Sequence, residues 1–426
     1  MICKPYPHLG ECVYETTLPN GLLIRVVPKR GFAKTHAFLA VNYGSIDQNF
    51  RVDGISYMTP MGVAHYLEHK MFDMPDGNAM QMFSEYGGSP NAFTSYDMTA
   101  YYVECTDHVK ENLKILLQFV TTPWFTAESV EKERGIIEQE IRMYEDNADS
   151  CMFEDLYASL FASHPIRNSI AGTVESIQDI TEQTLYDCYH AFYTPANMML
   201  CVVGDVEAQM IFDLAEEIVP WGNTVPERDY GAPEIMQPVK KRVERQMEVS
   251  MPAFALGFKT EPSRLGADSM RQEIIGDLAA EILVGESSAL YTELYEKNLI
   301  DSGFSAGYEG LKGVSMLTAS GDSLDPEAVA AEILREADRI RREGVNEDLF
   351  QRLKRSALGR RIRNLDSFSS ICYRMCAYQF EETDCLAFPE RFHEVEVAHI
   401  AEFLERTVCE DRMSMAVVRP RRERGV

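Results

Sequence analysis

The sequence predicts an α+β protein of two homologous halves, each a mostly antiparallel sheet flanked by helices. Two observations support this: each half passes from strand patterns through helical patterns to a closing strand, and a segment rich in proline, glycine and charge separates the halves. The 426 residues suit two or three domains, and 45% of them are hydrophobic, enough for sizeable cores. We expect an N-terminal domain at 1–222, a linker at 223–242 and a C-terminal domain at 243–426.

The elements of both halves follow from short apolar runs, which predict strands, and from apolar periods of 3.6 residues, which predict helices. In the first half these are strands at 22–27 and 35–42, helices at 62–72 and 77–86, a strand pair around 91–104, a strand at 198–203 and a helix at 208–218. The second half begins near Val243, with strands at 253–258, within 304–320 and at 413–418, and helices at 268–283, 326–342 and 347–363.

Composition excludes several classes of function. The net charge of −26 argues against binding nucleic acid or an anionic membrane, because both require a basic surface. Neutral or basic peptides are more plausible ligands, although solubility alone also explains an acidic balance. The ten cysteines form no C-x-x-C pair, no signal-peptide pattern opens the chain, and no apolar run reaches the roughly 18 residues of a membrane span. We therefore expect a cytoplasmic protein in which Cys372 and Cys376 are packing residues.

The most informative motif is His-x-x-Glu-His at residues 65–69, which read His-Tyr-Leu-Glu-His. On a helix, with about 100° per residue, His65, Glu68 and His69 share one face of a segment that is apolar nearly all round. Burying two imidazoles and a carboxylate together is costly unless they have partners. A divalent metal supplies that partner, since two histidines four residues apart can bind one ion and a neighbouring glutamate can act as general base.

A plainer interpretation is that these are core histidines satisfied by backbone or tyrosine groups, which is the commoner role of a single buried histidine. Three such groups on one face favour the metal. The order His-x-x-Glu-His is also typical of inverted zinc peptidases.

A third ligand should lie downstream, because zinc bound by two histidines usually takes one more protein ligand, often a carboxylate, and keeps one position open. The acidic helical pattern at 129–146 is the richest candidate segment. Its expected buried arc consists of Val130, Ile136, Ile137, Ile141 and Tyr144. Of its acids, only Glu133 and Glu140 fall within that arc, two turns apart. Internal salt bridges are the alternative explanation for this pair.

The chain resembles the pitrilysin/insulinase family of zinc metallopeptidases, the inverzincins. It is similar in particular to the half-size bacterial members and to those like mitochondrial processing peptidase. The match spans nearly the whole chain. Beside the metal motif it rests on Gly87-Gly88, on Asn-Ala-Phe-Thr-Ser at 91–95, on Thr-Ala-Tyr-Tyr at 99–102 and on Glu-Arg-Gly-Ile-Ile-Glu-Gln-Glu-Ile at 133–141.

The resemblance implies a pitrilysin-like fold and a set of site residues. One Zn²⁺ per chain would be bound by His65, His69 and Glu140, with Glu68 as general base and Glu133 as a supporting acid. In the family, the strand matching residues 91–94 lies at a sheet edge beside the zinc, where an extended peptide can add by main-chain hydrogen bonds. Substrate binding is therefore expected at Asn91, Ala92 and Phe93, with Asn91 orienting the peptide.

One departure from the family concerns the second half. Self-sufficient relatives carry there an arginine and a tyrosine, seven residues apart, that help to bind the substrate and polarise its carbonyl. In the matching segment, Tyr295 stands in place of the arginine and Ser302 in place of the tyrosine. The resemblance thus implies a heterodimer with a related zinc-free subunit that carries the Arg/Tyr pair. A homodimer is the alternative.

The functional prediction is a zinc-dependent endopeptidase subunit that cleaves peptides or small unstructured proteins. The alternative is a non-catalytic scaffold or maturation-accessory member of the same family, which the four intact active-site residues disfavour. A thiol enzyme would have cysteines available but no motif.

Overall fold

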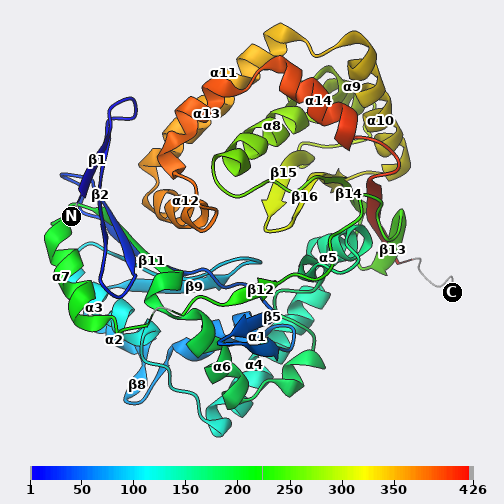
Figure 1. Ribbon diagram of the computed structural model, residues 1–426. Coiled ribbons are helices and arrows are strands. Elements are labelled where there is room, and N and C mark those ends of the chain that lie inside the picture. Colours follow the sequence, from blue (N-terminus) through cyan, green and yellow to red (C-terminus); the bar gives the residue numbers. More distant parts are fainter. Residues whose placement is uncertain (1, 223, 422–426) are drawn as a thin grey trace. The chain divides into compact units, whose positions relative to one another are not determined.

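The structure, a computed structural model, describes residues 2–222 and 224–421 (Figure 1). Asn223, at the start of the expected linker, lies outside the described residues, as do Met1 and residues 422–426. The chain forms two compact units, each assembled from three stretches. The first consists of Met1–Ile141, Ser169–Tyr230 and Ile362–Phe380, and the second of Arg142–Asn168, Gly231–Arg361 and Glu381–Val426.

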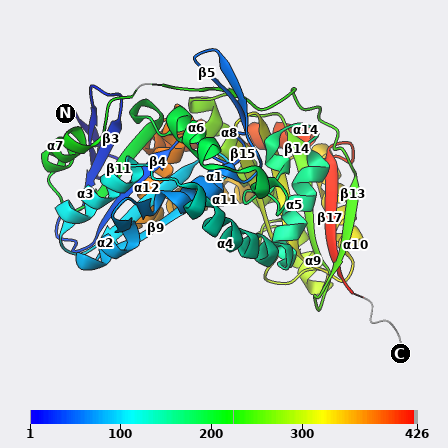
Figure 2. The same cartoon turned by 90° about the horizontal axis from the view of Figure 1, so that it is seen from below.

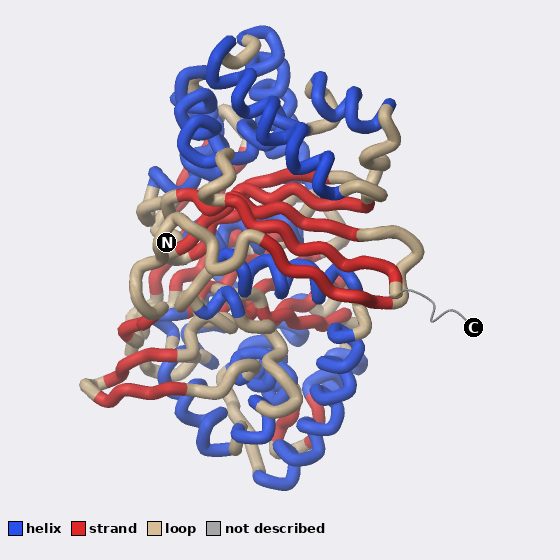
Figure 3. The backbone as a smooth tube through the Cα atoms, turned by 90° about the vertical axis from the view of Figure 1, so that its right-hand side faces the viewer, coloured by secondary structure: helices blue, strands red, loops and turns tan. Residues whose placement is uncertain are grey.

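A seven-stranded sheet forms the centre of the first unit. The strands of both units are red in Figure 3. In spatial order its strands are β1 (Ile2–Tyr6), β2 (Glu11–Thr17), β3 (Leu23–Pro28), β11 (Met198–Gly204), β4 (Thr35–Val41), β10 (Thr99–Cys105) and β9 (Ser89–Thr94). Only β3 and β11 pair in parallel. Strands β4 and β11 are buried along their whole length, as expected of strands covered on both faces. Strand β9 lies at the edge.

Helices cover both faces of this sheet. The helices of this unit are α1 (Val63–Met71), α2 (Ala79–Glu85), α3 (Val109–Val120), α6 (Glu182–Phe192), α7 (Ala208–Ile218), the first part of α4 (Ala127–Glu145), and α12 (Phe368–Phe380). Helices α1 and α3 pack against β10, and α12 packs against β4 and β11 on the other face (Figures 1 and 2). Cys372 and Cys376 of α12 are fully buried, which confirms their role as packing residues.

The second unit contains a five-stranded sheet in the order β13 (Arg242–Met247), β17 (Met413–Pro420), β14 (Ala253–Thr260), β16 (Val314–Asp322) and β15 (Ser305–Leu311). Its helices are α5 (Ala148–Leu160), α8 (Ala267–Val284), α9 (Ala289–Glu296), α10 (Pro326–Glu343), most of α11 (Glu347–Arg363), α13 (Phe388–Glu394) and α14 (Val397–Thr407). Helix α5 packs against β14 and β17, and α8 packs against β15.

The two sheets share one topology. In each, a parallel pair (β3 with β11, or β13 with β17) is followed by three antiparallel pairings in the same sequential order. Each sheet also receives one helix from the other half of the sequence, since α12 packs in the first unit and α5 in the second. The predicted α+β class with two similar, mostly antiparallel halves is therefore confirmed.

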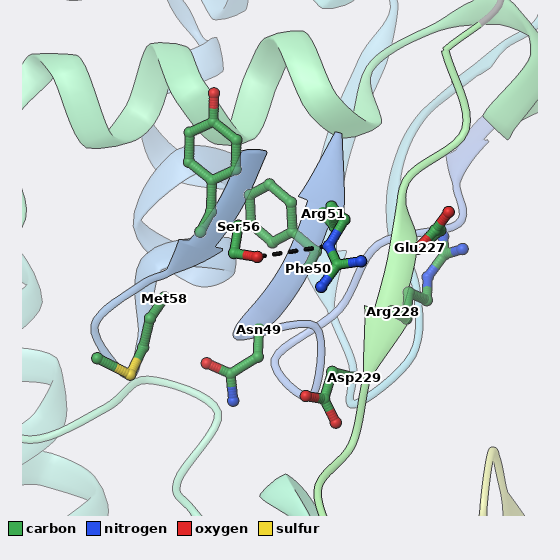
Figure 4. Close-up of a pocket in the computed structure, with 9 residues that line it drawn as sticks. Asn49, Phe50, Arg51, Ser56, Met58, Glu227, Arg228 and Asp229 are labelled. Carbon is green, nitrogen blue, oxygen red and sulfur yellow. Dashed lines mark hydrogen bonds between the residues drawn. The ribbon is translucent and has the colours of Figure 1, made fainter. Parts of the chain in front are cut away.

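Several strands were not predicted. The hairpin of β1 and β2 is half exposed, so it lacks an apolar run. A small second sheet joins β12 (Glu227–Asp229), from the expected linker, to β5 (Asn49–Val52) and β6 (Ile55–Met58). A pocket of about 350 Å³ opens on this sheet, and its lining includes Asn49, Arg51, Ser56, Met58 and Arg228 (Figure 4). Arg51 Nε donates to Ser56 Oγ across the hairpin at 3.4 Å.

Among the described residues, no helix is both long enough and apolar enough to cross a membrane.

Candidate metal centre

The entry to α1 depends on a glycine. Gly62, the N-cap residue, has a φ of 89°, in the left-handed region that favours glycine. A Cβ added there would lie 2.4 Å from the carbonyl oxygen of Ala171, so any other residue would push the helix away from that loop. Ser176 Oγ fixes the same loop to the helix entry by donating to the carbonyl of Met61 at 2.9 Å. The start of α1 is thus set by a close backbone contact and by one side-chain hydrogen bond.

Two polar side chains tie α1 to the N-terminal part of α4. The Tyr66 hydroxyl donates to the backbone carbonyl of Val130. Lys70, which is fully buried, donates from Nζ to the carbonyl of Ser129 at 3.2 Å and forms an ion pair with Asp73. Because a buried ammonium is costly without such partners, these contacts fix the rotation of α1 about its axis. That rotation directs the two histidines of the motif toward α4.

Histidines 65 and 69 and Glu140 converge. Their ligand atoms all lie within 4.8 Å of one another. Nε2 of His65 is 3.6 Å from Oε1 of Glu140, and Nε2 of His69 is 3.4 Å from Oε2 of the same carboxylate. In the part of the chain that the structure describes, no other group of three or more histidine, cysteine, aspartate or glutamate side chains meets this criterion.

These separations fit a shared metal ion. Two ligand atoms at about 2.1 Å from a tetrahedral zinc ion are about 3.4 Å apart. The two nitrogen–oxygen distances to Glu140 match that edge, and both exceed the usual hydrogen-bond length. Two imidazoles and one carboxylate are also a donor set that zinc prefers. The residues present therefore fit a zinc ion bound by His65, His69 and Glu140.

Glu133 lies behind the cluster and contacts His69. Its Oε1 is 3.0 Å from Nδ1 of His69, the ring nitrogen that faces away from Glu140. Burial lowers the pKa of His69, but the hydrogen bond to Glu133 and the nearby charges of Glu68, Glu133 and Glu140 outweigh it, so the net pKa is raised. With the Nδ1 proton held by Glu133, Nε2 carries the lone pair that a metal requires.

Glu68 shares the polar face of α1 but is not part of the three-residue cluster. Its side chain is buried, and Oε2 accepts a hydrogen bond from Thr94 Oγ1 at 2.8 Å. Burial raises the pKa of Glu68, while His65 and the Thr94 hydroxyl act in the opposite direction. The carboxylate is therefore held in one orientation beside the cluster, with its basicity increased by its surroundings.

The predicted substrate-binding residues lie on β9, at the edge of the seven-stranded sheet. The backbone N–H of Ala92 donates to Asn91 Oδ1 at 2.8 Å. Asn91 pairs with Tyr102 and Phe93 with Ala100 on β10. Because side chains alternate along a strand, Asn91 and Phe93 lie on one face of the sheet, and Ala92 and Thr94 on the face that carries Glu68. That these residues bind substrate stays a prediction.

Sequence reasoning missed two contributions to this site. Thr94 lies within the family motif at 91–95, but that motif did not indicate the hydrogen bond from Thr94 to Glu68. The sequence indicates the anchoring roles of Tyr66 and Lys70 only weakly, because the one clue is that polar side chains occur on the apolar side of α1. Tyr295 and Ser302, which replace the family's arginine and tyrosine, are both exposed, Tyr295 at the end of α9.

Two family models match the chain. One, described as insulinase (peptidase family M16), matches residues 33–174, which include the whole metal cluster. The other, described as the peptidase M16 inactive domain, matches residues 179–357.

Individual proteins and structures are similar over longer stretches. An uncharacterized zinc protease of Bacillus subtilis, YmfH, is 35% identical, with 98% of each chain covered. A mitochondrial-processing peptidase subunit beta of Caenorhabditis elegans is 29% identical over 47% of this chain and 43% of its own. A crystal structure described as that of an M16-like peptidase from Alicyclobacillus acidocaldarius has a TM-score of 0.93 and 31% identity, and the match covers 99% of this chain and all of the other.

Proposed function

Since the chain belongs to the insulinase family of peptidases, family M16, we propose that it is a zinc-dependent endopeptidase subunit that hydrolyses peptides or small unstructured proteins. Membership confirms the resemblance drawn from the sequence motifs and the pitrilysin-like fold. The observation that carries the proposal is the convergence of His65, His69 and Glu140 beside a buried Glu68. A scaffold protein has no need to keep four such groups together at the cost of burying them.

In this proposal the ligands are His65, His69 and Glu140, and Glu133 fixes the tautomer of His69 through Nδ1. When bound, Zn²⁺ supplies Lewis acidity, which polarises the scissile carbonyl and lowers the pKa of the attacking water.

Glu68 is the general base. It takes a proton from the attacking water and passes it to the leaving amine. Its buried position supports this role, because the raised pKa brings its proton affinity closer to the working pH. The hydrogen bond from Thr94 holds the Glu68 carboxylate, so the base does not have to be oriented when substrate arrives.

The peptide binds as an added strand along β9. Main-chain hydrogen bonds to this edge would hold it without regard to most of its side chains, which suits a peptidase of broad tolerance. Asn91 already accepts the N–H of Ala92. An incoming peptide carbonyl would replace that contact and free the Asn91 amide to orient the peptide.

The proposed partner is a related subunit without zinc ligands that supplies an arginine and a tyrosine. Tyr295 offers no guanidinium at the position of the family's arginine, and Ser302 offers no phenol at the position of its tyrosine. The name of the nematode relative, a subunit beta, supports an assembly of unlike chains. A homodimer is the alternative arrangement, and the cytoplasm is the proposed location.

The experiment is to purify the chain with and without a related zinc-free subunit of the same family, and to measure zinc content and peptide cleavage. Cleavage that is lost with a chelator, restored by zinc and absent from Glu68→Gln, while that variant keeps its zinc, supports the proposal. Zinc-loaded protein with no cleavage in either preparation supports the scaffold instead. Unchanged activity in Glu68→Gln removes the assigned mechanism.

A further inference from the structure

A cavity of about 350 Å³ lies in the first unit between the sheet and α12. Strands β4, β10 and β9 form one wall, through Phe38, Tyr102 and Phe93, and α12 forms the other, through Tyr373 and Arg374. We call this cavity the α12 pocket. It lies on the face of the sheet opposite the one that carries Glu68, so it is separate from the metal centre.

Four aromatic rings form most of its apolar surface. The ring of Phe93 lies 6.1 Å from that of Phe38, 6.4 Å from Tyr102 and 6.0 Å from Tyr373, measured between centroids. Phe38 and Tyr102 are stacked at 5.8 Å. Tyr373 is 44% exposed, although a side chain of this size on a packed helix is usually covered. Rings at these separations already contact one another, so they form one aromatic surface against which a further ring can pack with favourable contacts.

The polar groups of the pocket provide a single positive charge. His36 is buried, neither ring nitrogen has a hydrogen-bond partner, and its closest carboxylate, Glu104, is 3.8 Å from Nδ1. Burial lowers the pKa of His36 to about 4, so it is neutral at neutral pH. Arg374 lines the pocket, and no carboxylate of the described residues forms an ion pair with it. The pocket is therefore aromatic, with one guanidinium.

The position of Phe93 connects this pocket to the edge strand. Side chains of a peptide added along β9 would alternate between the two faces of the sheet, so every second one would lie on the face of Phe93. To enter the pocket such a side chain must pass over β9, a distance of about 4.8 Å, which is the spacing of neighbouring strands. Short side chains cannot reach that far. Lysine and arginine can, but the Arg374 guanidinium repels them.

We propose that the α12 pocket binds one aromatic side chain of a peptide held along β9, and that Tyr373 and Arg374 thereby determine which peptides the protein prefers. The inference rests on the proposed function for the peptide and its place at β9. It adds a substrate class, peptides with a phenylalanine, tyrosine or tryptophan at one position of the bound segment. Helix α12 comes from the second half of the sequence, so this half would select substrate for a site built by the first.

The test measures binding separately from turnover. A fluorescein-labelled peptide series carries phenylalanine, alanine, glutamate or lysine at each position in turn, and its affinity for the Glu68→Gln protein is read by fluorescence anisotropy. We expect one position at which phenylalanine binds about tenfold more tightly than alanine, as expected for a ring placed among several others. Tyr373→Ala should abolish most of that preference and Tyr373→Phe should keep it. Trp221→Ala, which removes an exposed ring elsewhere, is the matched control.

Arg374 gives a second readout. Arg374→Ala should raise the affinity for the lysine peptide at the same position relative to the alanine peptide, without changing the affinity of the alanine peptide. An aromatic preference that Tyr373→Ala leaves intact, or no preference at any position, overturns the proposal. Hydrolysis of the same peptides by the unmodified chain, with and without a related zinc-free subunit, is assayed in parallel. If binding depends on Tyr373 but no peptide is hydrolysed, the pocket proposal holds and the proposed peptidase function fails. If peptides are hydrolysed but binding does not depend on Tyr373, the peptidase function holds and the pocket proposal fails.

Discussion

Nδ1 of His69 lies 3.0 Å from Oε1 of Glu133, so a carboxylate from α4 orients a histidine of α1. The same helix supplies Glu140, whose two oxygens face the Nε2 atoms of His65 and His69. One helix thus carries both the carboxylate proposed as a ligand and the carboxylate that supports another ligand. Two turns separate these acids, which places both on the side of α4 that faces α1.

Glu133→Gln should weaken zinc binding about 10- to 100-fold, the usual effect of removing a carboxylate behind a metal-bound histidine. Competition with a chromophoric chelator measures the affinity. Glu131→Gln, on the exposed side of α4, is the control and should bind zinc as the unmodified chain does. Equal affinities in all three proteins would contradict the role of Glu133.

Zinc should raise the melting temperature of the chain, because a ligand that binds only the folded state stabilises it. The effect should be absent from Glu140→Gln, which lacks the carboxylate that faces both histidines. Differential scanning calorimetry with increasing zinc, and after chelation, gives the measurement. A similar zinc-dependent rise in Glu140→Gln would show that the metal binds elsewhere.

Thr94→Val should lower kcat about tenfold or more with zinc content unchanged, because Glu68 loses a hydrogen bond that is made to its charged form. Thr94→Ser keeps the hydroxyl and should recover most of the activity. Steady-state kinetics on one peptide, with zinc measured in each preparation, tests this. If valine and serine at position 94 gave the same kcat, the hydroxyl would have no role in holding the base.

Ala92→Pro should abolish peptide cleavage while leaving zinc bound. Proline removes the backbone N–H of residue 92, which now donates to Asn91. A bound peptide would need that N–H as a hydrogen-bond donor. The pairing of β9 with β10 should survive, because Pro90, two residues earlier on the same strand, already occupies an equivalent position in the ladder. Ala92→Ser, which keeps the N–H, is the control. Normal cleavage by the proline variant would rule out strand addition at β9.

Stability should fall in acid through Glu234. Burial raises the pKa of this carboxyl, but the backbone N–H groups of Ala162, Ser163 and His164, together with Lys259, lower it to about 2, from an ordinary value of 4.5. Because the folded state has the lower pKa, this contribution to stability is complete above pH 4.5 and is lost as the pH falls toward 2.

Urea unfolding at several pH values measures this loss. Glu234→Gln should be less stable than the unmodified chain at neutral pH and should show a shallower decline between pH 4.5 and 2. Glu248→Gln, at an exposed carboxylate, should follow the unmodified chain. Parallel declines in all three proteins would exclude Glu234 as a source of acid sensitivity.

Helical periodicity predicted most of the candidate metal centre because the relevant residues lie on two helices, and one face of a helix can be predicted from local spacing. It grouped His65, Glu68 and His69, and it separated Glu133 and Glu140 from the other acids of α4. Its precision was limited at the border of the buried arc. Ile136, expected within that arc, is 50% exposed. A helical wheel assigns a direction but does not show how wide a neighbouring element is.

The sequence alone predicted most of the elements, the likeness of the two halves and the candidate donor atoms for zinc, because each depends on local spacing or on a motif. Only the tertiary structure decided which distant segments meet. It placed Thr94 of β9 against Glu68, and it brought α12 onto the sheet of the first unit, where Tyr373 meets Phe93. Such contacts follow from the order of strands in a sheet and the exchange of helices between halves. Local propensity predicts neither the strand order nor the exchange of helices.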